Sequence, residues 1–242
     1  MAEPSLEEIG RKHGTDKVTH GYLPHYERLF APFRHDTFSL LEIGVRTGES
    51  VRMWHDYFPH ARIVGLDIEA VRLPDEAELT RYTFVQGSQD DPETLGRLAQ
   101  EHALRVIVDD GSHLWSHQIA TFQALFPTLS AGGVYICEDI HTSFGGRRQR
   151  FRGDAAESAA AYFLRLAEIV IAGKARKLET PVAAPLLDLA LAASSAIFIR
   201  DGVIFTRNAD AFGTRPARRD RRPRRTREER AASRREQESM SL

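Results

Sequence analysis

The chain has 242 residues, enough for one α/β domain with extensions, and its composition (42% hydrophobic, 28% charged) is that of a globular protein. The formal net charge of −1 hides an asymmetry. Residues 215–242 contain eleven arginines and five acidic residues, so the preceding 214 residues carry a charge of −7. An acidic body does not suggest a nucleic-acid-binding domain, and we expect no specific nucleic-acid partner.

Cysteine usage and hydropathy indicate the compartment. The chain has one cysteine, Cys137, which excludes an intramolecular disulfide and fits a reducing cytoplasm. The N-terminus lacks the basic region and apolar stretch of a signal peptide. The longest mainly apolar stretch, residues 181–199, is interrupted by Asp188 and is a poor membrane span. We therefore expect a cytoplasmic protein without a membrane partner.

Residues 1–35 precede the first predicted strand. Leu6 and Ile9 among charged neighbours suggest a short amphipathic helix, and Gly14-Thr-Asp-Lys17 breaks it. Residues 20–30 then crowd histidines and tyrosines around one proline. This segment is either a cap packed on the domain or a lid that closes a ligand site.

Residues 36–208 alternate predicted strands with helices. The strands are expected at residues 38–44, 61–67, 82–86, 106–108 and 133–137, with helices after the first strand, across 92–102 and across 116–125. Alternation of this kind predicts an α/β fold with a doubly wound, mostly parallel sheet. Right-handed crossovers then place the C-terminal ends of the parallel strands at one edge.

Beyond the fifth strand, the pattern changes. Residues 145–153 form a loop rich in glycine and arginine, and residues 155–171 predict an alanine-rich helix. Residues 194–206 surround Asp201-Gly202 and predict an antiparallel hairpin, which completes a seven-stranded sheet. Residues 209–242 are arginine-rich without apolar periodicity and predict a disordered tail, either solvated or in contact with RNA or acidic surfaces.

A glycine-bearing turn follows the first strand. Glu42-x-Gly44-x-x-x-Gly48 opens a helix, and Asp67 ends the second strand. Glycine lets a ligand approach the backbone, and an acid at the position of Asp67 can accept both ribose hydroxyls of an adenosine. A dinucleotide site would have a glycine where this chain has Glu42. A carboxylate there disfavours a pyrophosphate but suits the cationic amino acid end of S-adenosylmethionine.

Acidic residues also follow the fourth and fifth strands. Asp110, Glu138 and Asp139 supply the hard oxygen ligands that Mg²⁺ prefers, and His113 follows Asp110 closely. His113 and His117 could form half of a zinc site on a helix, but His113 falls in the turn and we interpret His117 as structural. An imidazole is a suitable general base near neutral pH, so His113 can act on a hydroxyl that a divalent cation has acidified.

The motifs Leu41-Glu-Ile-Gly-Val, Gly65-Leu-Asp-Ile, Asp109-Asp-Gly-Ser-His and Glu138-Asp together resemble the class I S-adenosylmethionine-dependent methyltransferases. Within these the chain most resembles the metal-dependent sugar O-methyltransferases of macrolide biosynthesis, from about Gly14 to Ser143. The resemblance implies a Rossmann-like sheet, Mg²⁺ ligated by Asp110, Glu138 and Asp139, and His113 as the base. The predicted cofactor contacts are Glu42, Gly44, Gly48, Asp67, Ser88, Gln89 and Asp109.

Two features depart from that family. Its members carry a further N-terminal domain that this sequence does not contain, and an acid is expected where this chain has Ser88. The resemblance nevertheless implies an Mg²⁺-dependent O-methyltransferase that acts on a sugar hydroxyl of a glycosylated natural product and forms a homo-oligomer. The alternatives are a cephalosporin hydroxylase-like or catechol-type enzyme, and a non-catalytic cofactor-binding partner.

Overall fold

A computed structural model describes residues 3–173 and 182–209. The predicted arginine-rich tail lies outside the described residues except for Ala209. Within the described ranges, no helix has both the length and the apolar character needed to cross a lipid bilayer.

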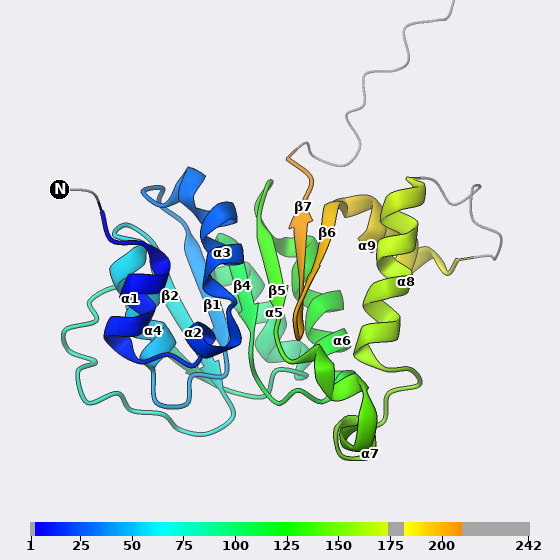
Figure 1. Ribbon diagram of the computed structural model, residues 1–242, viewed down its shortest axis with the longest axis horizontal. Coiled ribbons are helices and arrows are strands. Elements are labelled where there is room, and N and C mark those ends of the chain that lie inside the picture. Colours follow the sequence, from blue (N-terminus) through cyan, green and yellow to red (C-terminus); the bar gives the residue numbers. More distant parts are fainter. Residues whose placement is uncertain (1–2, 174–181, 210–242) are drawn as a thin grey trace, which may run out of the picture. The chain divides into compact units, whose positions relative to one another are not determined.

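A seven-stranded mixed sheet organises the described chain (Figure 1). Its strands are β1 (Ser39–Ile43), β2 (Arg62–Asp67), β3 (Tyr82–Gln86), β4 (Leu104–Asp109), β5 (Val134–Cys137), β6 (Ala193–Ile199) and β7 (Gly202–Arg207). Their order is β3-β2-β1-β4-β5-β7-β6; the first five are parallel, and β7 pairs antiparallel with both β5 and β6. The predicted doubly wound sheet with a C-terminal hairpin is confirmed.

The hairpin turn lies one residue earlier than the sequence suggests. Ile199 pairs with Gly202, so Arg200 and Asp201 form the two-residue loop and Gly202 begins β7. Asp201 supplies the left-handed backbone of the turn, with a φ of 62°. Aspartate tolerates this conformation better than most residues because its short polar side chain can bond locally.

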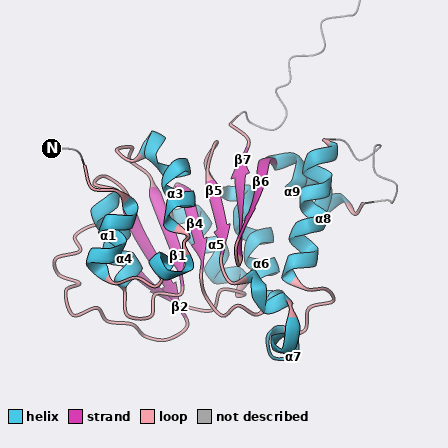
Figure 2. Cartoon of the chain, viewed as in Figure 1, coloured by secondary structure: helices cyan, strands magenta, loops and turns pink. Residues whose placement is uncertain are grey.

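Helices cover both faces of the sheet (Figure 2). The α-helices are α1 (Leu6–His13), α2 (Lys17–His20), α3 (Leu23–Phe30), α4 (Glu49–Tyr57), α5 (Pro92–Glu101), α6 (Trp115–Leu125), α7 (Arg148–Phe151), α8 (Ala159–Ala172) and α9 (Ala184–Ala192). The short 3-10 helices are η1 (Ala31–Phe33), η2 (Phe126–Thr128), η3 (Ile140–Ser143) and η4 (Gly145–Arg147).

The predicted elements after β5 differ from the observed ones in two places. The expected glycine- and arginine-rich loop contains η4 and α7. The alanine-rich helix begins at Ala159 rather than at residue 155, because the Ser158 side chain accepts a hydrogen bond from the Ala161 amide and caps the helix there.

Alternate strand residues face two separate hydrophobic clusters. Leu40 packs in the cluster under α1, α3 and α4, whereas Leu41 and Ile43 pack in the cluster under α5, α6, α8 and α9. This alternation follows from the two-residue period of a strand. It gives the sheet an apolar layer on both faces and leaves its C-terminal edge for polar residues.

Phe122 lies at the centre of the second cluster. Its ring is fully buried and contacts Phe126, Tyr135, Phe163 and Phe205 at centroid distances of 4.8–5.2 Å. We expect Phe122→Ala to lower the free energy of unfolding by about 3–5 kcal/mol, because the lost ring leaves a cavity between α6 and the sheet. Urea unfolding followed by circular dichroism measures the loss, and a loss below about 1 kcal/mol would contradict this description of the core.

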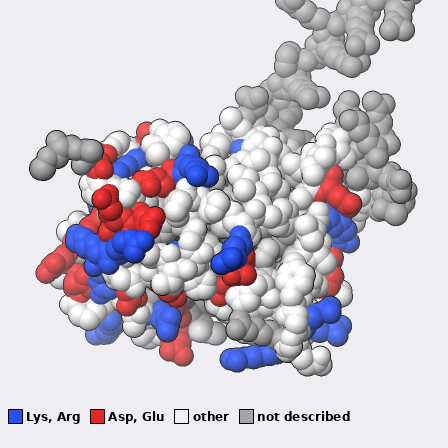
Figure 3. Space-filling view, viewed as in Figure 1, with Lys and Arg blue, Asp and Glu red and all other residues white. Residues whose placement is uncertain are grey.

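Charged side chains of both signs intermingle over α1 and α4 (Figure 3). Lys12 pairs with Asp56 at 2.6 Å, and Arg11 pairs with Glu7 one helical turn away. Exposed pairs such as these contribute little to stability, so most of the stability of the fold comes from the two hydrophobic clusters.

Candidate functional site

A cavity of about 680 Å³ opens at the C-terminal edge of the parallel strands. It lies where the strand order reverses between β1 and β4, the position at which open α/β sheets bind ligands. Of the residues predicted to form the site, those that line the cavity are Gly44, Asp67, Ser88, Gln89, Asp110, His113 and Asp139. Glu42, Gly48, Asp109 and Glu138 are not among the lining residues.

The glycine turn after β1 is built around close backbone contact. Gly44 has a φ of 89°, and a Cβ atom added there would lie 2.2 Å from the Asp110 carbonyl oxygen. The Asp110 amide in turn donates to the Ile43 carbonyl at 3.0 Å. Only glycine fits both the left-handed backbone and this approach, so the turn holds the β1 and β4 ends of the site together.

Asp67 secures the same turn from the end of β2. Its Oδ2 accepts hydrogen bonds from the Val45 amide at 2.9 Å and the Arg46 amide at 3.1 Å, while Oδ1 accepts from the Glu69 amide at 3.0 Å. A carboxylate oxygen has two lone pairs, so Asp67 retains acceptor capacity toward the cavity that it lines.

Asp109 is buried and holds Gln89, a residue that lines the cavity. It is 1% exposed and accepts hydrogen bonds from Gln89 Nε2 at 2.9 Å and from the Tyr135 hydroxyl at 3.0 Å. Gln89 Oε1 then accepts from the Ser112 amide at 2.7 Å. Burial raises the pKa of Asp109 to about 7. Asp109 thus holds Gln89 in place and does not line the cavity, and its predicted cofactor contact stays a prediction.

The Glu42 side chain lies in the protein interior, which its place in the motif does not predict. Its side chain is fully buried, and neither oxygen has a hydrogen-bond partner of standard geometry among the described residues. Burial raises the pKa of Glu42 to about 7, an effect that the nearby Lys17 charge opposes. In this structure Glu42 stands behind the cavity wall, and its predicted contact with a cofactor stays a prediction.

Gly48 also stands outside the cavity lining. It precedes α4 with a φ of 81°, and a Cβ atom there would meet the Leu73 side chain at 2.4 Å. Its observed role is to let the chain turn tightly into α4 beneath Leu73.

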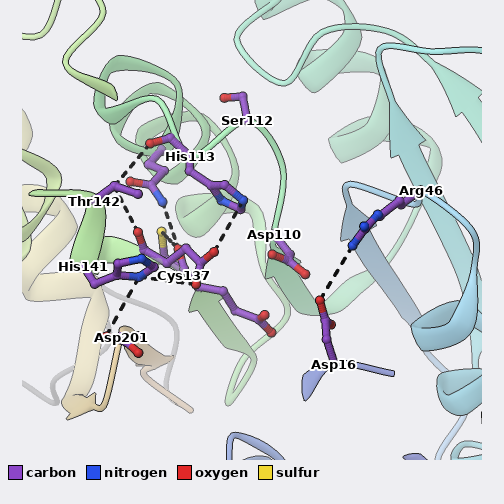
Figure 4. A network of polar contacts seen from close by, with 12 residues as sticks. Asp16, Arg46, Asp110, Ser112, His113, Cys137, His141, Thr142 and Asp201 are labelled. Carbon is purple, nitrogen blue, oxygen red and sulfur yellow. Dashed lines mark hydrogen bonds and ion pairs between the residues drawn. The ribbon is translucent and has the colours of Figure 1, made fainter. Parts of the chain in front are cut away.

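Asp110, His113 and Asp139 converge at the cavity, each offering one ligand atom within 4.8 Å of the others. Figure 4 shows Asp110 and His113 of this group. His113 Nε2 lies 3.5 Å from Asp139 Oδ2. His113 and Asp139 both adopt left-handed backbone conformations, with φ values of 58° and 57°. Such conformations are uncommon outside glycine and are concentrated at functional sites, because the surrounding structure has to maintain them.

Glu138 is not part of this cluster, and two side chains of the N-terminal segment bind its carboxylate. Its Oε2 accepts a hydrogen bond from Lys17 Nζ at 2.9 Å, and its Oε1 accepts one from the Tyr26 hydroxyl at 2.9 Å. Lys17 Nζ also donates to Asp110 Oδ2 at 2.6 Å. The three acids predicted to bind Mg²⁺ therefore divide in this structure into a cavity pair, Asp110 and Asp139, and a buried Glu138.

The N-terminal segment thus forms one wall of the site. Gly14, Thr15 and Asp16 line the cavity, and Asp16 lies 3.9 Å from Arg46 of the glycine turn (Figure 4). Tyr22 donates a hydrogen bond to Asp139 Oδ1 at 3.3 Å. Lys17, Tyr22 and Tyr26 were not among the predicted site residues. The sequence signals for them were the segment's inclusion in the family resemblance and, for the two tyrosines, the crowding of aromatic residues in residues 20–30.

His117 also lines the cavity, and its predicted structural role stays a prediction. Its Nδ1 lies 3.0 Å from the Ser112 hydroxyl and its Nε2 lies 3.2 Å from Asp90, both near the cavity rim. It is not part of the group of possible ligands around Asp110.

The sheet order, the glycine turn and the acidic cluster define the class of fold, which is that of the S-adenosylmethionine-dependent methyltransferases. The structure superposes on the MycE methyltransferase of mycinamycin biosynthesis, solved in complex with Mg and SAH, with a TM-score of 0.73 and 27% identity. That alignment covers 96% of this chain and 60% of the other.

The sequence is homologous to sugar O-methyltransferases of macrolide and polyketide pathways. It is 38% identical over 159 residues to mycinamicin VI 2''-O-methyltransferase of Micromonospora griseorubida, which covers 60% of this chain and 39% of the relative. It is also 38% identical over 149 residues to a tetracenomycin-C 3'-O-methyltransferase of Streptomyces olivaceus, covering 57% of this chain and 37% of the relative. No family model matches the chain. The chain spans about two fifths of the length of these curated relatives.

Proposed function

We propose that this protein is an Mg²⁺-dependent O-methyltransferase that transfers the methyl group of S-adenosylmethionine to a sugar hydroxyl of a glycosylated natural product. The observation that carries the proposal is the convergence of Asp110, His113 and Asp139 at the cavity beside the Gly44 turn. One edge of the sheet thereby offers a place for a methyl donor and a place for a metal-bound hydroxyl.

The residues present fit a hard divalent cation. Asp110 and Asp139 offer carboxylate oxygens that are partly accessible from the cavity, with side-chain exposures of 24% and 21%. Oxygen donors of this kind suit Mg²⁺, which keeps positions for water or substrate. Glu138 completes the proposed set from beneath, although its carboxylate is engaged by Lys17 and Tyr26. When bound, the cation would lower the pKa of a coordinated hydroxyl.

The residues also fit the methyl donor. Asp67 presents a carboxylate to the cavity for the ribose hydroxyls, while the Gly44 turn gives a ligand access to the backbone. Ser88 and Gln89 line the adjoining wall. The cavity volume is within the range of small-molecule sites, which is about 300–1,000 Å³.

His113 is the proposed general base. Its imidazole lines the cavity three residues beyond Asp110, and the Asp139 carboxylate at 3.5 Å would stabilise the imidazolium formed when the ring accepts the hydroxyl proton. Tyr22 holds the other oxygen of Asp139 and so fixes the carboxylate that faces the imidazole.

The proposal is tested by incubating the full chain with S-adenosylmethionine, Mg²⁺ and a panel of glycosylated macrolides and polyketides, with methylated products detected by mass spectrometry. We expect methylation of a sugar hydroxyl that EDTA abolishes and added Mg²⁺ restores, because the hydroxyl is a poor nucleophile without the cation. Methyl transfer that is insensitive to EDTA would exclude the metal. Methylation of catechols but not of glycosides would favour the catechol-type alternative. Assembly into a homo-oligomer stays a prediction, which light scattering of the same sample measures.

A further inference from the structure

Lys17 is a cation in the interior, surrounded by acids from three strands. Its side chain is 1% exposed, and its ammonium group lies 2.6 Å from Asp110 Oδ2, 2.9 Å from Glu138 Oε2 and 3.8 Å from Glu42 Oε1. The helix that carries it, α2, is only four residues long and begins at Lys17 itself. The side chain therefore enters the site from the start of a short helix that directly follows the cavity-lining residues Gly14, Thr15 and Asp16.

Acids outnumber cations around Lys17. Glu42, Asp110 and Glu138 surround one ammonium group; Ser50 and Trp54 are polar neighbours of Glu42, and the Tyr26 hydroxyl donates a hydrogen bond to Glu138. Three acids therefore share the one ammonium group, which lies within 4 Å of each of them.

Glu42 adds a third acid to the buried side of this group. It is fully buried beside Ser50 and Trp54, neither of which forms a hydrogen bond of standard geometry with it, and the Lys17 ammonium is 3.8 Å from its nearer oxygen. Burying a carboxylate is costly, and a cation nearby relieves that cost. In many enzymes two divalent ions about 3.5–4 Å apart share a set of carboxylates of this kind.

We propose that Lys17 is a resident cation that takes the place of a second divalent ion, so that the acids of this site bind one metal ion instead of two. The inference rests on the proposed metal site and adds a residue that determines how many ions it accepts. The ammonium group is held between Asp110, which also faces the cavity, and Glu138, which does not line it. Lys17 thereby engages one oxygen each of Asp110 and Glu138 and leaves their remaining acceptor capacity, together with Asp139, for the single ion.

The test is a titration of the full chain with Mn²⁺, in which electron paramagnetic resonance measures the free ion at equilibrium. We expect Lys17→Ala to bind one more Mn²⁺ per chain than the wild type, because it removes the ammonium and opens space for a hydrated ion. Lys17→Met removes the charge but keeps most of the side-chain volume. It is expected to bind the same number of ions as the wild type, with an affinity raised on the order of tenfold or more.

Two control variants separate charge from packing. Tyr26→Phe removes the neutral hydrogen bond to Glu138 and is expected to keep the wild-type number of ions. The double variant Lys17→Ala/Glu138→Gln removes one cation and one acid together. It is expected to lack the additional ion that Lys17→Ala binds. Lys17→Ala with the wild-type number and affinity of ions, or Tyr26→Phe with the same gain as Lys17→Ala, would overturn the proposal.

The design remains informative when the single variant is unstable. If Lys17→Ala does not fold in EDTA, Mn²⁺ must restore its circular dichroism spectrum and the double variant must fold without metal; failure of either overturns the inference. The titration requires neither methyl donor nor acceptor. A wild type without methyl transfer would contradict the proposed function, whereas an active wild type with an unchanged Lys17→Ala titration would contradict only the role of Lys17.

Discussion

His113→Ala is expected to lower kcat for methyl transfer about 10²–10⁴-fold, the usual contribution of a general base, while the Kd for S-adenosylmethionine stays nearly unchanged. The two effects separate because the imidazole faces the acid cluster, whereas the Gly44 turn and Asp67 form the wall proposed for the donor. Single-turnover kinetics and isothermal titration calorimetry measure the two quantities on the same sample.

His117→Ala is the matched control for His113. Both imidazoles line the cavity, but His117 contacts Ser112 and Asp90 and stands outside the group of possible ligands. We expect His117→Ala to retain kcat within a few-fold of the wild type. Full activity of His113→Ala at neutral pH, or an equal loss in both variants, would contradict the assignment of His113 as the base.

Gly44→Ala is expected to weaken both the fold and the binding of the methyl donor. A left-handed backbone costs a residue with a Cβ atom about 1–2 kcal/mol, and overpacking adds about 1–3 kcal/mol. At Gly44 the added atom meets the Asp110 carbonyl oxygen at 2.2 Å, and this is main chain that cannot rotate away. The β1 and β4 ends must then separate, which disturbs the cavity wall. Urea unfolding and calorimetric titration with S-adenosylmethionine measure the two losses.

Gly132→Ala measures the cost of a left-handed backbone without the steric clash that Gly44→Ala introduces. Gly132 has a φ of 72°, similar to Gly44, but a Cβ atom there would meet nothing within 4 Å. The Gly132→Ala substitution should lower the free energy of unfolding by about 1–2 kcal/mol and leave donor binding intact. If the two alanine variants are equally stable and bind the donor equally well, the close approach of Gly44 to Asp110 does not shape the site.

Local sequence patterns predict most of this fold because its elements are signalled by near neighbours. The β-branched run before Asp109 marks a buried strand, and the Asp-Gly pair near residue 201 marks the hairpin. The parallel order of the strands then requires Asp67, Asp110 and Asp139 to reach the same edge of the sheet. That inference depends only on strand direction, which explains why it holds without knowledge of any side-chain contact.

The surroundings of the acids depend on contacts that no local pattern encodes. Lys17 meets Asp110 across 93 residues of sequence and Glu138 across 121 residues. A lysine near the N-terminus is ordinarily exposed, so its burial follows only from the packing of α1–α3 against the sheet. The same packing covers Glu42, whose position in the motif suggested a ligand contact and whose side chain lies behind the cavity wall.

The central claim is that a methyl donor and a divalent cation bind side by side at the C-terminal edge of the sheet. Nuclear magnetic resonance of S-adenosylmethionine with the full chain tests it most directly, through the relaxation of the S-methyl protons when Mn²⁺ replaces Mg²⁺. We predict strong paramagnetic broadening of the methyl signal in the wild type and its loss in Asp110→Asn/Asp139→Asn, which still binds the donor. A methyl signal that Mn²⁺ leaves unchanged while the donor is bound would contradict the account.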